Sequence, residues 1–160
     1  MPKALVVNLD KCTGCRSCEL ACSFAHHGEF NPAKSAVHVG IFADKAFFVP
    51  VVCNQCSKPF CKEVCPTGAL YSSKENNAYV VKVNQEKCVG CKMCMLACPF
   101  GTITMQENGL AQKCDLCGGA PECVVFCVTG AMEFKEIEES SLEKTRATAK
   151  KLYQLQEDSQ

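Results

Sequence analysis

The hydrophobic positions of this chain fall in short runs that polar or glycine-containing turns separate. Runs of this length are typical of strands and hairpins rather than of a helical bundle. Single strands are predicted at residues 4–8 and 131–137. Three hairpins are predicted between them, from paired runs at residues 37–41 and 47–52, 69–73 and 78–83, and 102–106 and 110–112.

Two segments have a helical pattern instead. The first is residues 17–25, and the second begins at Ser140, which forms a capping box with Glu143. Acidic residues at the start and basic residues toward the end of the second segment suit a helix dipole. We interpret residues 138–160 as a C-terminal helical docking extension for a partner subunit or another copy of the chain; the alternative is a marginal helix packed on its own domain.

Sixteen cysteines dominate the chemistry of the sequence. They form four groups of four, which we number in chain order: Cys12, Cys15, Cys18, Cys22; Cys53, Cys56, Cys61, Cys65; Cys88, Cys91, Cys94, Cys98; and Cys114, Cys117, Cys123, Cys127. Sixteen thiolates are what four 4Fe-4S clusters need. Group three, with Pro99, reads CxxCxxCxxxCP, the run in which three cysteines hold one cluster and the fourth reaches another. The sequence therefore predicts a two-cluster unit, used twice.

Other uses of the cysteines fit less well. Structural zinc would leave the third and fourth cysteines of each group without a role, and disulfides need an oxidising compartment for which we find no signal. A 3Fe-4S cluster at one site is harder to exclude, although every group keeps all four cysteines. A Rieske-type site needs histidines in place of cysteines, so His26, His27 and His38 are interpreted as surface or hydrogen-bonded structural residues.

The groups sort into an inner and an outer pair. Residues 53–105 read as a contiguous two-cluster ferredoxin, which we call the inner unit, and residues 1–52 with 106–137 form the outer unit. Exchange of the fourth cysteine within each unit predicts four ligand sets, sites 1 to 4; pairing group one with two and three with four is the alternative. The sets are Cys12, Cys15, Cys18, Cys127 (site 1); Cys53, Cys56, Cys61, Cys98 (site 2); Cys88, Cys91, Cys94, Cys65 (site 3); and Cys114, Cys117, Cys123, Cys22 (site 4).

Composition narrows the function. Seventeen Lys and Arg balance seventeen Asp and Glu, which favours neither nucleic acid nor an acidic partner. We find no nucleotide-binding loop and no nucleophile motif, so the chain is expected to move electrons and not to be an enzyme on its own. Since there is no apolar stretch long enough to span a membrane and no signal region, we expect a cytoplasmic protein; export bound to a signal-bearing partner is the alternative.

The order and spacing of the four groups resemble the four-cluster ferredoxin-like subunits of the dimethyl-sulfoxide-reductase type. The resemblance implies an α+β fold of two ferredoxin-like modules related by a pseudo-twofold axis, with short helices and β-hairpins. The segments CTGCRSCELACSFAHHGEFNP and KCDLCGGAPECVVFC are similar to small iron-sulfur subunits of carbon monoxide dehydrogenases and tungsten-dependent aldehyde oxidoreductases. Val128 departs from the proline usual in these relatives, which puts the geometry around Cys127 in doubt.

The resemblance also implies partners. We expect single electrons to pass between a large catalytic subunit and a FAD/NAD-binding subunit or another acceptor. The catalytic subunit is expected to carry a tungsten or molybdenum pterin, and an aldehyde-oxidising subunit is favoured. The alternatives are an iron-sulfur subunit of a carbon monoxide dehydrogenase, formate dehydrogenase or hydrogenase, and a free-standing polyferredoxin. A third class is a scaffold whose copies stack into a conducting array.

Overall fold

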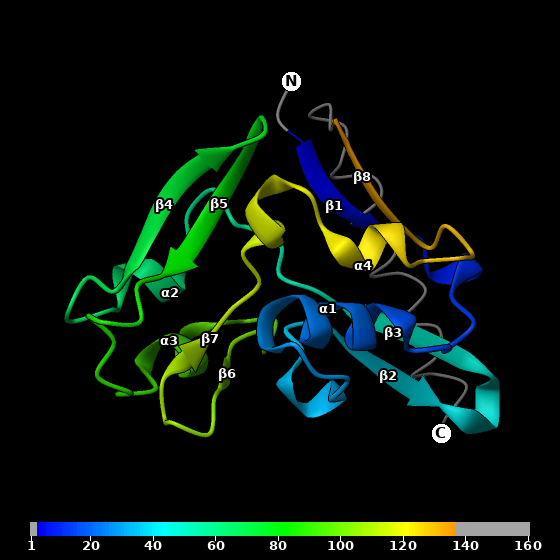
Figure 1. Ribbon diagram of the computed structural model, residues 1–160, viewed down its shortest axis with the longest axis horizontal. Coiled ribbons are helices and arrows are strands. Elements are labelled where there is room, and N and C mark those ends of the chain that lie inside the picture. Colours follow the sequence, from blue (N-terminus) through cyan, green and yellow to red (C-terminus); the bar gives the residue numbers. More distant parts are fainter. Residues whose placement is uncertain (1–2, 137–160) are drawn as a thin grey trace.

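A four-stranded sheet brings the two ends of the folded chain together. The structure is a computed structural model, and it describes residues 3–136. The sheet has the order β4–β5–β1–β8, with strands β4 (Leu70–Glu75), β5 (Ala78–Val83), β1 (Lys3–Val7) and β8 (Met132–Glu136). Strands β1 and β8, blue and orange in Figure 1, run antiparallel along their whole length, so the first and last described strands are neighbours.

The predicted hairpins all form. Strand β2 (His38–Phe42) pairs with β3 (Phe47–Val51), β4 pairs with β5, and β6 (Thr104–Met105) pairs with β7 (Ala111–Gln112). The β4–β5 turn is tighter than expected, because only Asn76 and Asn77 lie outside the strands. Both have positive φ, 45° and 64°, which the two-residue turn of a twisted hairpin requires and which asparagine tolerates. The predicted strand at 4–8 begins and ends one residue earlier, and that at 131–137 is β8.

Four helices carry cysteines, and they pack in pairs. Helix α1 (Ser17–His27) packs against α4 (Glu122–Val125), and α2 (Phe60–Glu63) packs against α3 (Met93–Ala97). Helices α1 and α3 begin after a left-handed residue, whereas α2 and α4 begin after a proline. Groups one and three therefore share one local structure, and groups two and four share another. Short 3-10 turns complete the fold at Leu9–Lys11, Pro32–Lys34, Ala43–Lys45 and Leu116–Gly119.

The core is built around thiols. Three clusters of buried residues hold it together, and each contains cysteines from more than one group. Apolar side chains such as Leu116, Val37, Val80 and Val81 complete these clusters and are at most 1% exposed. Among residues 3–136, none of the helices has the length and hydropathy needed to cross a bilayer. The C-terminal segment predicted to be helical lies outside the described residues.

A buried carboxylate joins helix α1 to strand β2. Glu19 is 2% exposed, and its side chain accepts hydrogen bonds from the backbone N–H of Val39 at 2.7 Å and from the Arg16 guanidinium at 2.5 Å. Buried charges persist only where partners of this kind satisfy them. Glu19 therefore holds the helix that carries Cys18 and Cys22 against the β2–β3 hairpin.

We predict that Glu19→Ala lowers the free energy of unfolding by about 1–3 kcal/mol, because it leaves the Val39 N–H without its acceptor. The measurement is anaerobic denaturant unfolding of the iron-loaded protein, with iron content checked for each variant. Glu29→Ala is the control, since Glu29 makes an exposed ion pair with Lys34 and such pairs contribute little. Equal losses in the two variants would contradict the prediction.

Candidate metal centres

All four groups bend the chain in the same way at their first CxxC step. The residue before the second cysteine is left-handed in each, with φ of 70° at Gly14, 45° at Gln55, 67° at Gly90 and 56° at Leu116. Backbone turns that combine right- and left-handed residues point successive N–H groups into one concavity, which favours anions. Each loop is thus shaped to hold a negatively charged centre between its cysteines.

Two of these positions leave no room for a side chain. A Cβ atom on Gly90 would lie 2.5 Å from the carbonyl oxygen of Gly109, and one on Gly14 would lie 2.4 Å from the Phe48 ring. The group-three loop therefore packs directly on the backbone turn of the β6–β7 hairpin. Glycine is required here both by its positive φ and by this close approach.

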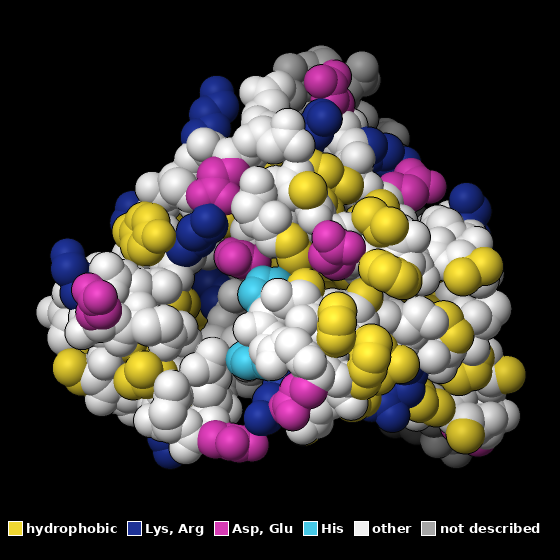
Figure 2. Space-filling view, in the orientation of Figure 1, with side chains coloured by type: hydrophobic (Ala, Val, Ile, Leu, Met, Phe, Trp, Pro, Cys, Tyr) yellow, Lys and Arg dark blue, Asp and Glu magenta, His cyan; other side chains and the backbone are white. Residues whose placement is uncertain are grey.

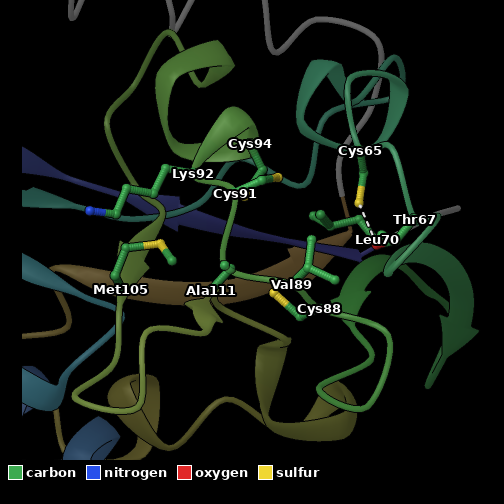
Figure 3. A pocket seen from close by; sticks show the side chains of 11 residues that line it. Cys65, Thr67, Leu70, Cys88, Val89, Cys91, Lys92, Cys94, Met105 and Ala111 are labelled. Carbon is green, nitrogen blue, oxygen red and sulfur yellow. Dashed lines mark hydrogen bonds between the residues drawn. The ribbon is translucent and has the colours of Figure 1, made fainter.

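The cysteines predicted for site 3 line one small pocket. Cys65 comes from the loop after α2, while Cys88, Cys91 and Cys94 come from group three and the start of α3 (Figure 3). The rest of the lining is mainly apolar and includes Leu70, Met105 and Ala111. Burial raises the pKa of Cys94, and the charges of Cys88, Cys65 and Cys91 add to this effect. The fourth cysteine of group two thus lies with the first three of group three.

At site 2 the same exchange of neighbours is seen. Burial raises the pKa values of Cys56 and Cys61, and the charges of Cys53 and Cys98 raise both further. Cys98 belongs to group three by sequence, but it lies beside the cysteines of group two.

Sites 1 and 4 draw on both ends of the chain. Burial raises the pKa of Cys123, with contributions from Cys114, Cys117 and Cys22 in that order. Cys18 and Cys123 share one buried cluster, against which Cys127 packs. The structure therefore gathers Cys22 with group four and brings Cys127 to the cluster that contains Cys18.

The third and fourth cysteines of the groups differ in their electrostatics. Burial raises the pKa of every third cysteine, to about 12 for Cys18. At the fourth cysteines of groups one to three, burial acts in the same direction, but hydrogen bonds outweigh it and the pKa is lowered. The Ala36 N–H donates to the sulfur of Cys22 at 3.4 Å, for example, and the Thr102 hydroxyl lies 3.4 Å from that of Cys98.

The turn after the last cysteine is the same with and without proline. The N–H of Gly68, Gly101 and Gly130 donates to the carbonyl of Cys65, Cys98 and Cys127, respectively, at 3.3, 3.2 and 3.0 Å. All three glycines have φ between 61° and 64°. Val128 therefore leaves the backbone geometry around Cys127 unchanged, and its side chain is 91% exposed.

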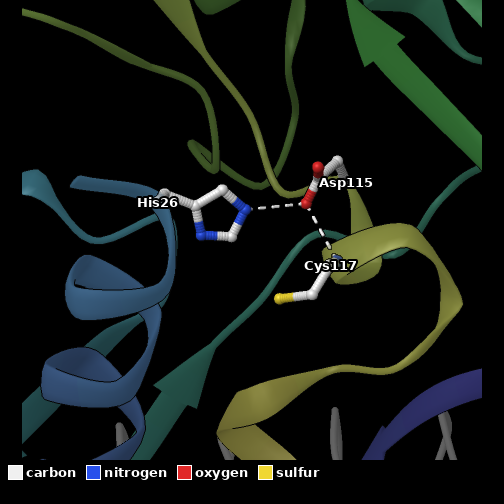
Figure 4. A group of neighbouring side chains, drawn as sticks. All are labelled: His26, Asp115 and Cys117. Atoms are coloured by element: carbon white, nitrogen blue, oxygen red, sulfur yellow. Dashed lines mark hydrogen bonds and ion pairs between the residues drawn. The ribbon is translucent and has the colours of Figure 1, made fainter. Parts of the chain in front are cut away.

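His26 forms two hydrogen bonds beside the cysteines predicted for site 4. Its Nε2 lies 3.0 Å from Oδ1 of Asp115 (Figure 4). Its Nδ1 lies 3.0 Å from the carbonyl oxygen of Cys22. Because a carbonyl oxygen and a carboxylate accept hydrogen bonds, both ring nitrogens act as donors here, and the hydrogen bond to Asp115 raises the pKa of His26 to about 11. His26, Asp115 and Cys117 have ligand-type atoms within 4.8 Å of one another, but a doubly protonated imidazole has no lone pair for a metal.

Gln55 is a feature of the site that the sequence did not indicate. Its amide nitrogen donates to the carbonyl of Cys114 at 2.7 Å, and its amide oxygen accepts from the N–H of Val81 at 2.9 Å. Gln55 thus ties the group-two loop to group four and to β5. No sequence pattern around a glutamine inside a CxxC step indicates a contact with a residue as distant in the chain as Cys114.

The donor set suits iron-sulfur clusters. All sixteen cysteines are free thiols, none of which forms a disulfide. Cys15 and Cys91 are exposed, whereas Cys53 and Cys114 are buried, so sites 1 and 3 lie nearest solvent and sites 2 and 4 lie deeper. Thiolate-only sets in loops with inward N–H groups fit 4Fe-4S clusters.

Comparisons with known proteins agree with this chemistry. Residues 44–137 match the family model described as a 4Fe-4S dicluster domain, and residues 3–24 match a 4Fe-4S binding domain. The chain is 41% identical over 125 residues to an aliphatic sulfonate oxidoreductase polyferredoxin-like subunit of Pyrococcus furiosus, covering 77% of this chain and 70% of that one. It is 35% identical to a probable anaerobic dimethyl sulfoxide reductase chain, YnfG, of Escherichia coli, covering 83% and 73%.

A solved structure is also similar. The BamBC active-site complex of benzoyl coenzyme A reductase with benzoyl-CoA contains a chain that matches with a TM-score of 0.51 and 28% identity, over 92% of this chain and 88% of that one. The predicted resemblance to dimethyl-sulfoxide-reductase-type subunits is confirmed.

We predict that Gly90→Ala removes the metal of site 3, because the added Cβ would collide with the Gly109 carbonyl. Gly68→Ala is the matched control, since Gly68 has nearly the same φ but nothing within 4 Å of its Cβ position. Iron analysis after anaerobic purification is expected to give about four irons fewer for Gly90→Ala and little change for Gly68→Ala. A similar loss of iron in both variants would mean that backbone strain at a positive φ, and not the collision with Gly109, causes the loss.

Proposed function

We propose, from the premise that this chain belongs to the 4Fe-4S dicluster family, that it is the electron-transfer subunit of an oxidoreductase complex. The chain binds 4Fe-4S clusters, and its sixteen cysteines are enough for four. The observation that carries the proposal is that cysteines far apart in sequence gather into thiolate sets beside inward-turned loops. When bound, such clusters take up and release single electrons. The chain's own residues hold the ligands, exclude water and balance charge.

We infer that sites 1 to 4 are the ligand sets predicted from the sequence. The common pocket of Cys65 with group three supports the assignment of site 3. The proximity of Cys98 to Cys53, Cys56 and Cys61 supports that of site 2, and the neighbours of Cys123 support that of site 4. For site 1, the support is the shared buried cluster of Cys18 and Cys127.

The inner and outer units are proposed as two ferredoxin-like modules related by a pseudo-twofold axis. In each unit, the helix of one group begins after a residue in the left-handed conformation, and the helix of the other group begins after a proline. The two helices of each unit pack against each other. Each also contributes an antiparallel strand pair to the sheet, β4–β5 from the inner unit and β1–β8 from the outer. Strands β1 and β5 then join the two units in parallel at Lys3 and Ala78.

The partner is proposed to be a large catalytic subunit. Relatives named as a dimethyl sulfoxide reductase chain and as a polyferredoxin-like subunit of an oxidoreductase support this role. Similarity of the group-one and group-four segments to subunits of tungsten aldehyde oxidoreductases makes an aldehyde-oxidising tungsten pterin subunit the first partner to test. A flavin or NAD-binding subunit is proposed as the second partner. The exposed Cys15 and Cys91 mark sites 1 and 3 as the ends accessible to partners.

Paired substitutions test the exchange of ligands. If Cys98 and Cys53 hold the same cluster, the variant C53S/C98S loses one cluster and keeps about twelve irons. The variant C91S/C98S then loses two and keeps about eight. If each group instead holds its own cluster, the two iron contents are reversed. Anaerobic iron and sulfide analysis with EPR of the reduced proteins measures the difference.

Anaerobic co-purification tests the role. We expect the tagged chain to bring down a large subunit at fixed stoichiometry, with tungsten detected by elemental analysis of the complex. A protein that carries four clusters but purifies alone would point to a free-standing polyferredoxin, and long homopolymers would point to a conducting array. Zinc in place of iron would refute the electron-transfer proposal altogether.

A further inference from the structure

Lys113 is a half-buried cation whose hydrogen-bond acceptors are all neutral. Its ammonium donates to the amide oxygen of Gln55 at 2.9 Å, to the carbonyl of Val81 at 2.9 Å and to the carbonyl of Cys114 at 3.1 Å. All three acceptors are uncharged. Within residues 3–136, none of the ion pairs found involves Lys113. A half-buried ammonium held only by neutral groups is costly unless negative charge lies close by.

The negative charge available at this place is that of the thiolates. Lys113 opposes the effect of burial on the pKa values of Cys56 and Cys61, which belong to site 2, and of Cys114, which belongs to site 4. Cys53 and Cys114 also lie in one buried cluster. Lys113 of the outer unit thus sits where the cysteines of the two deeper sites approach each other, and its position is fixed by two residues of the inner unit, Gln55 and Val81.

The other lysines that precede a group differ. Lys87 stands directly before Cys88 as Lys113 stands before Cys114, but it is exposed. Lys11, before Cys12, is 50% exposed and faces Glu133 at 3.8 Å. In the space-filling view, basic side chains lie both on the rim and in the hollow between the β4–β5 end and the rest of the molecule (Figure 2). Sequence position alone therefore does not set the electrostatic role of a lysine here.

We propose that Lys113 is a positioning residue for electron transfer, shared by sites 2 and 4, whose fixed positive charge raises the reduction potentials at both relative to the exposed sites 1 and 3. The inference rests on the proposed function. An electron added to a site brings one negative charge, and a cation held nearby in a poorly screened position stabilises that reduced state. Gln55 orients the cation by accepting one of its hydrogen bonds.

The test is an anaerobic redox titration followed by EPR, on Lys113→Met, Lys113→Arg and the matched control Lys87→Met. Iron and sulfide content is measured on every sample. We expect full iron in all three, a shift of two of the four reduction steps to lower potential in Lys113→Met, and near wild-type steps in Lys113→Arg and Lys87→Met. Unchanged steps in an iron-replete Lys113→Met, or an equal shift of all four steps, would overturn the proposal.

A second variant covers the case in which Lys113→Met loses iron. Gln55→Glu keeps an acceptor for Lys113 but adds a negative charge at the same place, and it is expected to lower the same two steps. An iron-replete Gln55→Glu protein with wild-type steps overturns the proposal. Failure of the underlying function is recognised separately, because the wild-type protein would then contain far fewer than about sixteen irons.

Discussion

The constraint on which this structure depends is that sixteen thiols, seven of them buried, share one small protein. Buried thiols resist ionisation, as the raised pKa values of Cys18, Cys114 and Cys123 indicate, yet a metal ligand must be a thiolate. The fold stabilises the thiolates with N–H and hydroxyl donors at the fourth cysteine of a group, and with inward-turned loops at its first two cysteines. Burial disfavours the thiolate charge, and a bound metal balances it. Metal binding is therefore expected to complete the folding of the core.

Much of this fold could be predicted from the sequence because its signals are local. The strand after residue 3, the helix from Ser17 and all three hairpins follow from short-range patterns of apolar residues and turn residues. The predicted β4–β5 turn was two residues too long at its start, since Lys74 and Glu75 look like turn residues but continue a strand in which Lys74 faces Tyr79. Tertiary pairing overrode their weak strand preference.

The long-range features of the site could not be predicted in this way. The proposed cysteine sets rest on a rule about the fourth cysteine, but no local pattern indicates that Gln55 reaches Cys114, or that His26 is fixed by Asp115, 89 residues away. The doubt about Val128 had the same origin. Proline restricts its own φ, yet here the left-handed Gly130 and its bond to Cys127 define the turn, so the proline is dispensable.

Charge balance is the second constraint on how the cysteines are arranged. A 4Fe-4S cluster with four thiolates is anionic, and two of them near each other in a medium of low dielectric repel strongly. Two basic side chains lie among the cysteines: Lys113, whose acceptors are all neutral, and His26, which is paired with Asp115. Lys113 donates to the carbonyl of Cys114, and His26 lies 3.0 Å from the carbonyl of Cys22. Solvent screens charge at exposed cysteines such as Cys15 and Cys91, whereas at the buried Cys22 and Cys114 these two basic side chains supply part of the charge balance.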